Sequence, residues 1–340
     1  MGANSKALIT GISGFIAGNL AQALQAEGIA VVGVGRSPSS FVGNGTRFVP
    51  LDMRDFDGCV AVLQAEKPQT VYHLAANSVL SAMLTEGPHT MLATNAFGTL
   101  NLLEACRIAE VPTVVVASSD KQYGAMAKPP YEDADTSGFQ NGGVYELSKA
   151  QQDQIARLYA GLYDVPAVRV ARLVNIYGPG DTQWTRIVPG TVRRLVRGER
   201  PRITAGPAGK ALREYLYVED CVRALRLLAA DAHRRGNLPL RSQDGKLAQV
   251  AFNLPSGQRF PAGEVIQTIQ RLLRDEFGIE GPEPEVQPGP EGVFEPGHQF
   301  VSGDRLQALF IEWLPLSLEE GLRRTIPWYL NHLDPAEPPP

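Results

Sequence analysis

A tyrosine and a lysine stand four residues apart in the run VYELSKA, as Tyr145 and Lys149, and the hydroxyl residue Ser119 lies upstream of them. Side chains at this spacing share one face of a helix, so the lysine ammonium can sit beneath the phenol. A nearby cation favours phenolate and lowers the pKa of a tyrosine from roughly 10 toward neutral pH. Such a phenol is a general base for a sugar or alcohol hydroxyl, and Ser119 can share the same substrate oxygen. Solvated helix faces also show this spacing, so its interpretation depends on the motifs around it.

A glycine-rich turn near the N-terminus predicts a dinucleotide site. The apolar run 7–10 is typical of a strand, and Gly11, Gly14 and Gly18 then lead into a helical segment that includes residues 19–24. Gly11 allows a tight turn, Gly14 lets the backbone approach a pyrophosphate, and Gly18 lets helix and strand pack closely. The helix N-terminus offers N–H groups and the positive end of its dipole to the phosphates.

Strand-like runs alternate with helical segments through the first half of the chain. The runs are 31–34, 47–51, 70–74, 114–117 and 167–171. This alternation predicts an α/β fold with a doubly wound parallel sheet and right-handed crossovers. A ligand is expected beyond the carboxyl ends of the strands, where Gly11, Arg36, Ala75 and Ser119 fall.

The pattern loosens after residue 177, where Gly, Pro and Arg become frequent. We therefore expect two domains and a tail. A dinucleotide-binding domain takes residues 1–177 and about 215–255, and a smaller substrate-binding domain takes 178–214 and 256–332. The proline-rich residues 333–340 are expected to be disordered.

The composition is ordinary for a globular protein of this length. The 340 residues are 44% hydrophobic and 20% charged, and the net charge of −4 gives no general attraction to nucleic acid. Cys59, Cys106 and Cys221 are far apart, which suggests a reducing compartment, and no residue cluster has metal-ligand spacing. No signal peptide or membrane-spanning run is evident. We expect a cytoplasmic protein with no nucleic-acid partner, no membrane partner and no metal.

Further motifs follow one another along the chain. They are His73 to Ala76, Asn95 in TNAFGTLNLLEA, the R-x-x-N-x-Y-G-P-G run of 172–180, and Arg213 to Asp220. With the glycine turn and the Tyr–Lys pair, they resemble the extended short-chain dehydrogenase/reductase family of sugar-nucleotide epimerases and dehydratases, nearly from end to end. The resemblance implies a Rossmann domain with a substrate lobe, a bound NADP or NAD, and a nucleotide-diphosphate sugar as substrate.

The resemblance also implies which residues touch each ligand. The implied cofactor contacts are Gly11, Ser13, Gly14, Phe15, Ile16, Gly18, Arg36, Asp52, Met53, Leu74, Ala75, Ala76, Asn95, Tyr145 and Lys149. The implied substrate contacts are Ser78, Asn175, Arg186 and Arg213.

The end of the second strand bears on the choice of cofactor. Enzymes that prefer NAD usually place an acid there, whereas this chain has Arg36, and Arg suits a 2′-phosphate. We therefore predict NADP in preference to NAD. The alternative is that Arg36 is a solvated loop residue or stacks on adenine. Asp52 matches the family position that meets adenine, or is an ordinary turn aspartate.

The dipeptide after Ser119 bears on the reaction. Asp120 and Lys121, and the run 180–189, resemble the CDP-glucose 4,6-dehydratase branch. The implied reaction is an internal hydride cycle on the bound cofactor. Tyr145 removes the C4 hydroxyl proton, Asp120 protonates the leaving C6 hydroxyl, and hydride returns to C6. Lys121 is either the base for the C5 proton or a fixed charge beside the enolate.

Other interpretations stay open at this point. A 4-epimerase or 4-keto reductase on a nucleotide-diphosphate sugar would use Asp120 and Lys121 only to shape the pocket. The dipeptide can also be a surface turn, and the chain can be a non-catalytic NADP-binding sensor. Family members commonly pair through two helices, here 98–109 and 146–163, so we expect a homodimer.

Overall fold

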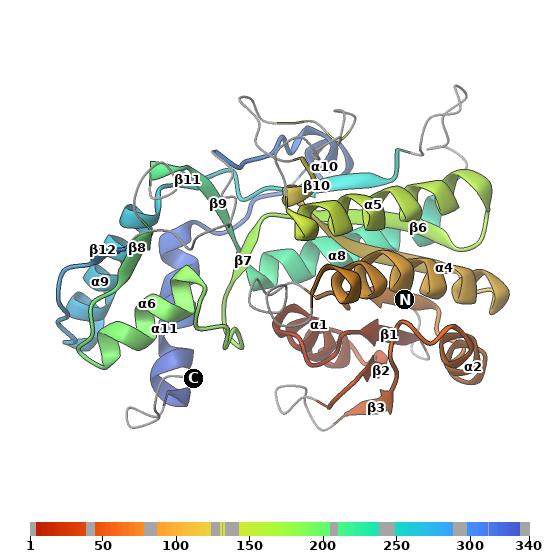
Figure 1. Ribbon diagram of the computed structural model, residues 1–340, viewed down its shortest axis with the longest axis horizontal. Helices are drawn as coiled ribbons and strands as arrows, with labels where there is room; N and C mark the ends of the chain where they lie inside the picture. Colours follow the sequence, from red (N-terminus) through yellow and green to blue (C-terminus); the bar gives the residue numbers. More distant parts are fainter. Residues whose placement is uncertain are drawn as a thin grey trace.

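The computed structural model describes residues 5–38, 45–77, 87–123, 130, 132, 143–204, 210–237, 249–287, 298–311 and 313–333. Figure 1 shows a layered α/β unit on one side of the molecule and a smaller group of helices and short strands on the other. The α/β fold predicted from the alternation of elements is confirmed.

A seven-stranded parallel sheet forms the centre of the larger unit, in the order β10-β6-β5-β4-β1-β2-β3. Its strands are β1 (Lys6–Thr10), β2 (Ala30–Gly35), β3 (Thr46–Pro50), β4 (Thr70–His73), β5 (Thr113–Ser119), β6 (Ala167–Leu173) and β10 (Ala251–Leu254). All residues of β4, β5 and β6 are buried. Both faces of these strands are therefore covered, which explains their nearly continuous apolar sequences.

Helices cover the sheet on both faces (Figure 1). They are α1 (Phe15–Ala26), α2 (Phe56–Glu66), α4 (Gly98–Ile108), α5 (Val144–Leu162) and α8 (Val218–Arg235). Successive side chains of a strand point to opposite faces, so Ile9 packs with the core under α1 and α8, whereas Leu8 packs with the core under α2, α4 and α5. This is the doubly wound arrangement.

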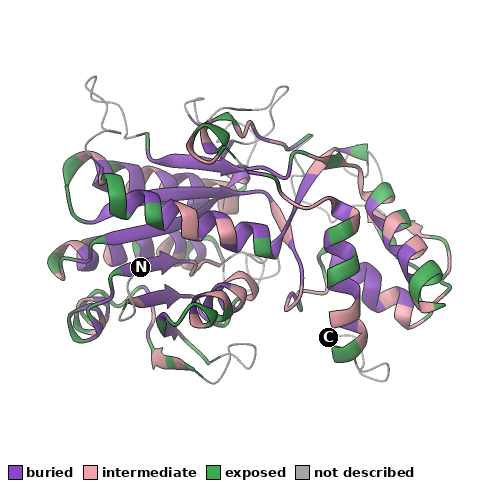
Figure 2. Ribbon diagram, turned by 180° about the vertical axis from the view of Figure 1, so that it is seen from behind, coloured by how far each residue is buried: buried purple, intermediate pink, exposed green. Residues whose placement is uncertain are grey.

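The smaller unit is built on three helices, α6 (Ile187–Val196), α9 (Ala262–Phe277) and α11 (Leu318–His332). Figure 2 shows that their buried faces turn toward one another. The remaining elements are β7 (Asn175–Tyr177), β8 (Arg202–Thr204), β9 (Arg213–Tyr217), β11 (Arg259–Phe260), β12 (Glu285–Gln287) and α10 (Asp304–Leu309). Because α8 and β10 lie with the large sheet, the chain enters the smaller unit twice. The domain division drawn from the sequence stays a prediction; residues 334–340 of the predicted tail lie outside the described residues.

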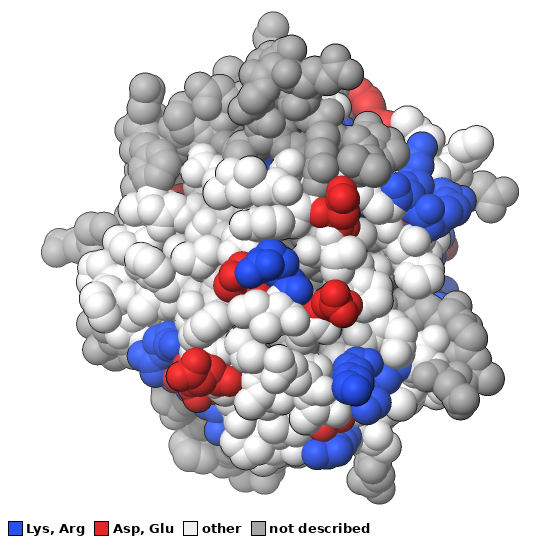
Figure 3. Space-filling model, turned by 90° about the vertical axis from the view of Figure 1, so that its right-hand side faces the viewer, with Lys and Arg blue, Asp and Glu red and all other residues white. Residues whose placement is uncertain are grey.

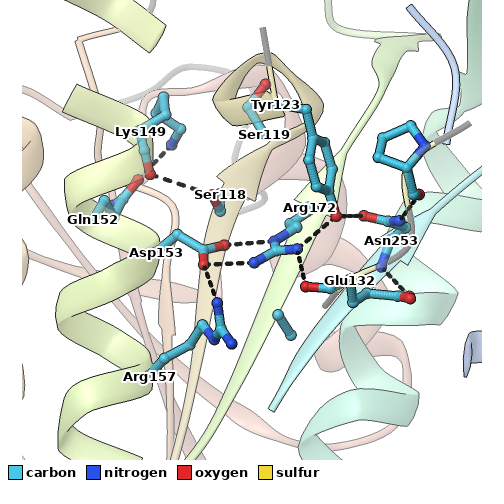
Figure 4. Close-up of polar contacts among 12 residues, drawn as sticks. Ser118, Ser119, Tyr123, Glu132, Lys149, Gln152, Asp153, Arg157, Arg172 and Asn253 are labelled. Atoms are coloured by element: carbon cyan, nitrogen blue, oxygen red, sulfur yellow. Dashed lines mark hydrogen bonds and ion pairs between the residues drawn. The ribbon is translucent and has the colours of Figure 1, made fainter. Parts of the chain in front are cut away.

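A buried ion pair joins α5 to the sheet. The guanidinium of Arg172 on β6 donates to both carboxylate oxygens of Asp153 on α5, at 2.7 and 2.8 Å (Figure 4). It also donates to the Tyr123 hydroxyl and, at 2.9 Å, to the Glu132 carbonyl. Both charged groups are fully buried, so this fork-to-fork contact fixes where α5 lies over the sheet.

The charged surface is mixed. Figure 3 shows Lys and Arg interspersed with Asp and Glu over a largely uncharged face. Among the described residues of that face, no extended patch of one sign gathers, in keeping with the net charge of −4.

Candidate active site

A cleft of about 1070 Å³ opens at the carboxyl ends of the strands. Its walls come from the turn after β1, the ends of β2, β4 and β5, the first turns of α5, and β7 and β9 on the other side. The elements that the sequence places at strand ends therefore meet in one cavity.

The glycine turn has the conformation that a pyrophosphate site requires. Gly11 has φ +67°, and a Cβ there would lie 2.7 Å from the Cα of Ala75. Gly14 is the N-cap of α1, and within the described part of the chain no side chain caps this helix and no acid lies in its first turn. Together with Ser13, these residues line the cleft and leave a bare helix N-terminus facing it, which suits an anion such as the pyrophosphate of a dinucleotide.

The other predicted cofactor contacts divide into two groups. Phe15, Ile16, Arg36, Asp52, Met53, Leu74, Ala75 and Ala76 all line the cleft. Gly18 and Asn95 are buried and are not among the described residues that line the cleft, so their contact with a cofactor stays a prediction. Asn95 instead accepts from the amide of Asn77 at 2.7 Å and donates to the Ser148 hydroxyl at 2.9 Å. It thereby ties the segment after β4 to α5, which is a supporting role.

A cation marks the end of β2. Arg36 is exposed at the rim of the cleft, and Asp52 lies across from it after β3. Asp52 is held by Arg54 at 2.6 Å, and the hydrogen bond from Arg54, aided by the charge of Arg36, lowers the pKa of Asp52. Asp52 therefore makes the local contact expected of a turn aspartate, and it also lines the cleft.

Ser119, Tyr145 and Lys149 all line the cleft. The Lys149 amine donates to the carbonyl of Ala117 at 2.8 Å and to Oε1 of Gln152 at 2.5 Å. Burial lowers the pKa of Lys149 to about 7. Its ammonium form is therefore only partly populated at neutral pH.

The pKa of Tyr145 differs from the expectation drawn from its spacing. Burial raises the pKa of the phenol to about 12, although a hydrogen bond with Ser119 opposes the shift. The physical reason is that desolvation disfavours the phenolate, while Lys149 is directed to Ala117 and Gln152. The four-residue spacing predicted that Lys149 lies on the same helix as Tyr145. It could not predict how far burial desolvates the phenol.

Asp120 and Lys121 line the same cavity. They begin a short 3-10 turn, Asp120–Tyr123, directly after β5. The Ser119 hydroxyl donates to Oδ1 of Asp120 at 3.1 Å. The Lys121 amine lies 3.4 Å from Asp120 and also donates to the side-chain oxygen of Gln299. The dipeptide is thus part of the cleft wall, with a half-buried lysine between two acceptors.

The predicted substrate residues lie on the opposite wall. Asn175, Arg186 and Arg213 line the cleft, while Ser78 lies outside the described residues. Arg186 is 3.1 Å from Asp181, whose pKa is raised by burial. The Asn175 amide donates to the Glu214 carbonyl at 2.9 Å, which fixes its orientation.

Two glutamines next to the site were not predicted from the sequence. Gln152 contacts Lys149 from within α5, and Gln299 contacts Lys121 from a segment far along the chain. The i,i+3 spacing of Lys149 and Gln152 on one helix could have indicated the first contact, whereas only the folded arrangement identifies the second.

The described ranges hold neither a metal-binding cluster nor a membrane-spanning helix. They contain no group of three His, Cys, Asp or Glu residues placed to hold a metal ion. None of their helices has both the length and the apolar character needed to cross a membrane.

Comparison with known proteins, like the geometry of the cleft, points to a nicotinamide dinucleotide site. A family model described as "NAD dependent epimerase/dehydratase family" matches residues 7–238. The dTDP-glucose 4,6-dehydratase of Xanthomonas campestris pv. campestris is 27% identical, covering 96% of this chain and 93% of its own. A probable UDP-glucuronate 4-epimerase of Rhizobium meliloti is also 27% identical, covering 95% and 96%. The solved structure of MoeE5 in complex with UDP-glucose and NAD has a TM-score of 0.78 at 25% identity, covering 97% and 100%.

Proposed function

Because the chain belongs to the NAD dependent epimerase/dehydratase family, we propose that it converts a nucleotide-diphosphate hexose to the 4-keto-6-deoxy sugar. The observation that carries this proposal is the placement of Asp120 and Lys121. Both side chains line the cleft that also contains Ser119 and Tyr145. An acid and a second ionisable group beside the phenol are what elimination of water needs in addition to oxidation at C4.

The cleft fits a nicotinamide dinucleotide. Gly11 and the bare N-terminus of α1 would hold the pyrophosphate, and Asp52 and Met53 would lie toward the adenosine end. When bound, the cofactor would supply hydride acceptance at the start of the cycle and hydride return at its end. NADP in preference to NAD stays a prediction that rests on Arg36, and the MoeE5 structure contains NAD.

The chain's own residues would handle the protons. Tyr145 accepts the proton of the C4 hydroxyl, and Ser119 donates a hydrogen bond to the same oxygen. Since the pKa of Tyr145 is about 12 here, the phenolate needs cationic help, which Lys149 on the same helix offers. Asp120 protonates the leaving C6 hydroxyl. Lys121 either takes the C5 proton or stabilises the enolate.

The diphosphate of the substrate would lie against the opposite wall. Arg186 and Arg213 both line the cleft there. A guanidinium can donate to two phosphate oxygens at once, so two such groups suit a diphosphate.

The second candidate is a 4-epimerase on the same class of substrate. The similarity to the probable UDP-glucuronate 4-epimerase favours it, at the same identity as the dehydratase. In that case Asp120 and Lys121 shape the pocket, and no water is eliminated.

The test is incubation with a panel of nucleotide-diphosphate hexoses and uronic acids. We expect a 4-keto-6-deoxy product, detected by its ultraviolet absorbance in alkali. Asp120→Asn should lower its formation about 10²- to 10⁴-fold, because the general acid is lost. Asp57→Asn, an exposed change in the first turn of α2, is the matched control. Formation of a C4 epimer by an Asp120→Asn variant as active as the native protein would establish the epimerase instead.

A further inference from the structure

A row of buried polar side chains runs from Lys149 into the sheet. The Lys149 amine donates to Oε1 of Gln152 at 2.5 Å, and the Gln152 amide donates to the Thr99 hydroxyl at 2.9 Å. Thr99 lies 2.9 Å from Nε2 of His73, and Nδ1 of His73 lies 2.8 Å from the Thr10 hydroxyl. Lys149 is 4% exposed and the other four residues are fully buried. Figure 4 shows the contact between Lys149 and Gln152 at one end of this row.

The hydrogen positions at Thr99 follow from its partners. Its hydroxyl lies 2.6 Å from the carbonyl oxygen of Asn95, which can only accept, so the single hydroxyl hydrogen is donated there. The oxygen of Thr99 must therefore accept from both Gln152 and His73. Because Thr99 accepts, Gln152 turns its NH₂ group to Thr99 and its oxygen to Lys149.

The tautomer of His73 follows in turn. Burial, aided by the charge of Lys149, lowers the pKa of His73 to about 3, so the ring is neutral and carries one N–H. That hydrogen is on Nε2, facing Thr99, and Nδ1 accepts from the Thr10 hydroxyl. The Thr10 oxygen accepts from the amides of Leu74 and Ala75 at 3.1 and 3.0 Å. Every hydrogen in the row is thus assigned: Gln152 and His73 both donate to Thr99, and Thr10 donates to His73.

The row ends at the dinucleotide turn. Thr10 immediately precedes Gly11, whose Cα hydrogen faces Ala75 so closely that a Cβ would clash. Lys149 is consequently linked, through side chains only, to the backbone that lines the cleft at Leu74 and Ala75.

We propose that Gln152 is a positioning residue for Lys149, and that Thr99, whose hydrogen is donated to the Asn95 carbonyl, ensures that Gln152 presents an acceptor to the amine. Two of the three N–H positions of the ammonium are then used, on Gln152 and on the Ala117 carbonyl. Among the described residues no partner takes the third position, which we assign to a ligand in the cleft. This inference rests on the proposed role of Lys149 beside Tyr145, but not on the choice between dehydratase and epimerase.

The other charged groups around Lys149 define what Gln152 adds. On α5 itself, Asp153 favours the charged amine, and Arg172 from β6 holds that carboxylate in place. From β4, His73 is neutral, and Tyr145 faces the cleft as a neutral phenol. None of these groups donates or accepts at the position that Gln152 occupies, so the Gln152 oxygen contributes separately to holding the ammonium.

The experiment measures the pKa of Lys149 in the cofactor-free protein, from the pH dependence of its ¹³Cε chemical shift, assigned with Lys149→Arg. Gln152→Leu removes the acceptor and should lower the pKa of Lys149 by about one unit. Gln152→Glu adds a negative charge and should raise it by a similar amount. Gln151→Leu and Gln151→Glu, at the neighbouring, partly exposed position of α5, should leave it unchanged.

In the enzyme with cofactor and substrate, the alkaline limb of the kcat profile should move to lower pH in Gln152→Leu and to higher pH in Gln152→Glu. KM for the sugar nucleotide should change little. An unchanged pKa of Lys149 in either folded Gln152 variant would overturn the proposal. The fold of each variant is checked by near-ultraviolet circular dichroism, and either variant alone decides the question. Because the pKa needs no substrate, a failure of the proposed reaction would leave this measurement intact, and the two failures are distinguishable.

Discussion

At the scale of single residues, Tyr145 and Lys149 are both shifted toward their neutral forms. Burial places the pKa of the phenol near 12 and that of the amine near 7. A neutral phenol and a partly neutral amine reduce the cost of buried charge in the cofactor-free protein. Very little of a phenol with this pKa is ionised at neutral pH, so a positive charge arriving in the cleft would favour its phenolate form. Catalysis at this site is therefore expected to depend on ligand binding.

Arg36 decides the dinucleotide preference in our proposal. Arg36→Ser removes the guanidinium at the end of β2 and should weaken binding of NADP roughly tenfold or more, through loss of a charge-assisted hydrogen bond. Binding of NAD should change little. Titration calorimetry with both dinucleotides checks this, with exposed Arg200→Ser as the control. Tighter binding of NAD than of NADP by the native protein would contradict it.

At the scale of elements, α5 carries the proposed base and is held to the sheet by a buried ion pair. Tyr145 and Lys149 stand in its first two turns, and Asp153 follows one turn later. The pair with Arg172 holds that third position to β6, on the strand next to the one that ends in Ser119. The distance between α5 and the carboxyl end of β5 is therefore set by the Asp153–Arg172 ion pair. Neither residue of this pair is among the described residues that line the cleft.

Breaking that contact should be costly. Asp153→Asn leaves the Arg172 guanidinium buried without its counter-ion, and we expect a loss of about 3 kcal/mol or more in the free energy of unfolding. Asp275→Asn breaks the exposed pair with Arg274 and should cost less than about 1 kcal/mol. Urea unfolding of the two variants and the native protein measures the difference. Equal losses for both substitutions would show that α5 is not held in this way.

The elements of the larger unit could be predicted from the sequence better than the contacts between them. The expected runs at 31–34 and 167–171 fall within β2 and β6, and the helix expected at 98–109 is α4. Apolar runs and glycine turns are local signals, which is why these succeeded. The role of Gln299, the burial of Asn95 and the raised pKa of Tyr145 arise from residues distant in sequence. No local pattern records them.

At the scale of the whole molecule, α4 and α5 present apolar side chains to solvent. The exposed ones on or directly next to these helices are Phe97, Leu100, Ile108, Leu158, Leu162 and Tyr163. Leu158 and Leu162 are four residues apart and share one face of α5. Exposed apolar surface of this extent is typical of an association site, which supports the homodimer expected from the resemblance.

The dimer can be tested by placing charge on that face. Leu158→Glu combined with Leu162→Glu should convert a dimer to a monomer, because carboxylates would be buried without partners. Val286→Glu, on the exposed strand β12, is the control and should leave the mass unchanged. Sedimentation equilibrium gives the mass of each. A native protein that sediments as a monomer would refute the proposal.

The chain returns to the large sheet after it has first passed through the smaller unit. This order limits how the two units can be separated by truncation. The outer strand β10 is supplied by residues 251–254, after β7, α6 and β9 have been completed. A polypeptide ending at residue 237 would leave β6, the strand that carries Arg169 and Arg172, as an unpaired edge of the sheet. The two units are interlaced, and neither can be excised by a single cut.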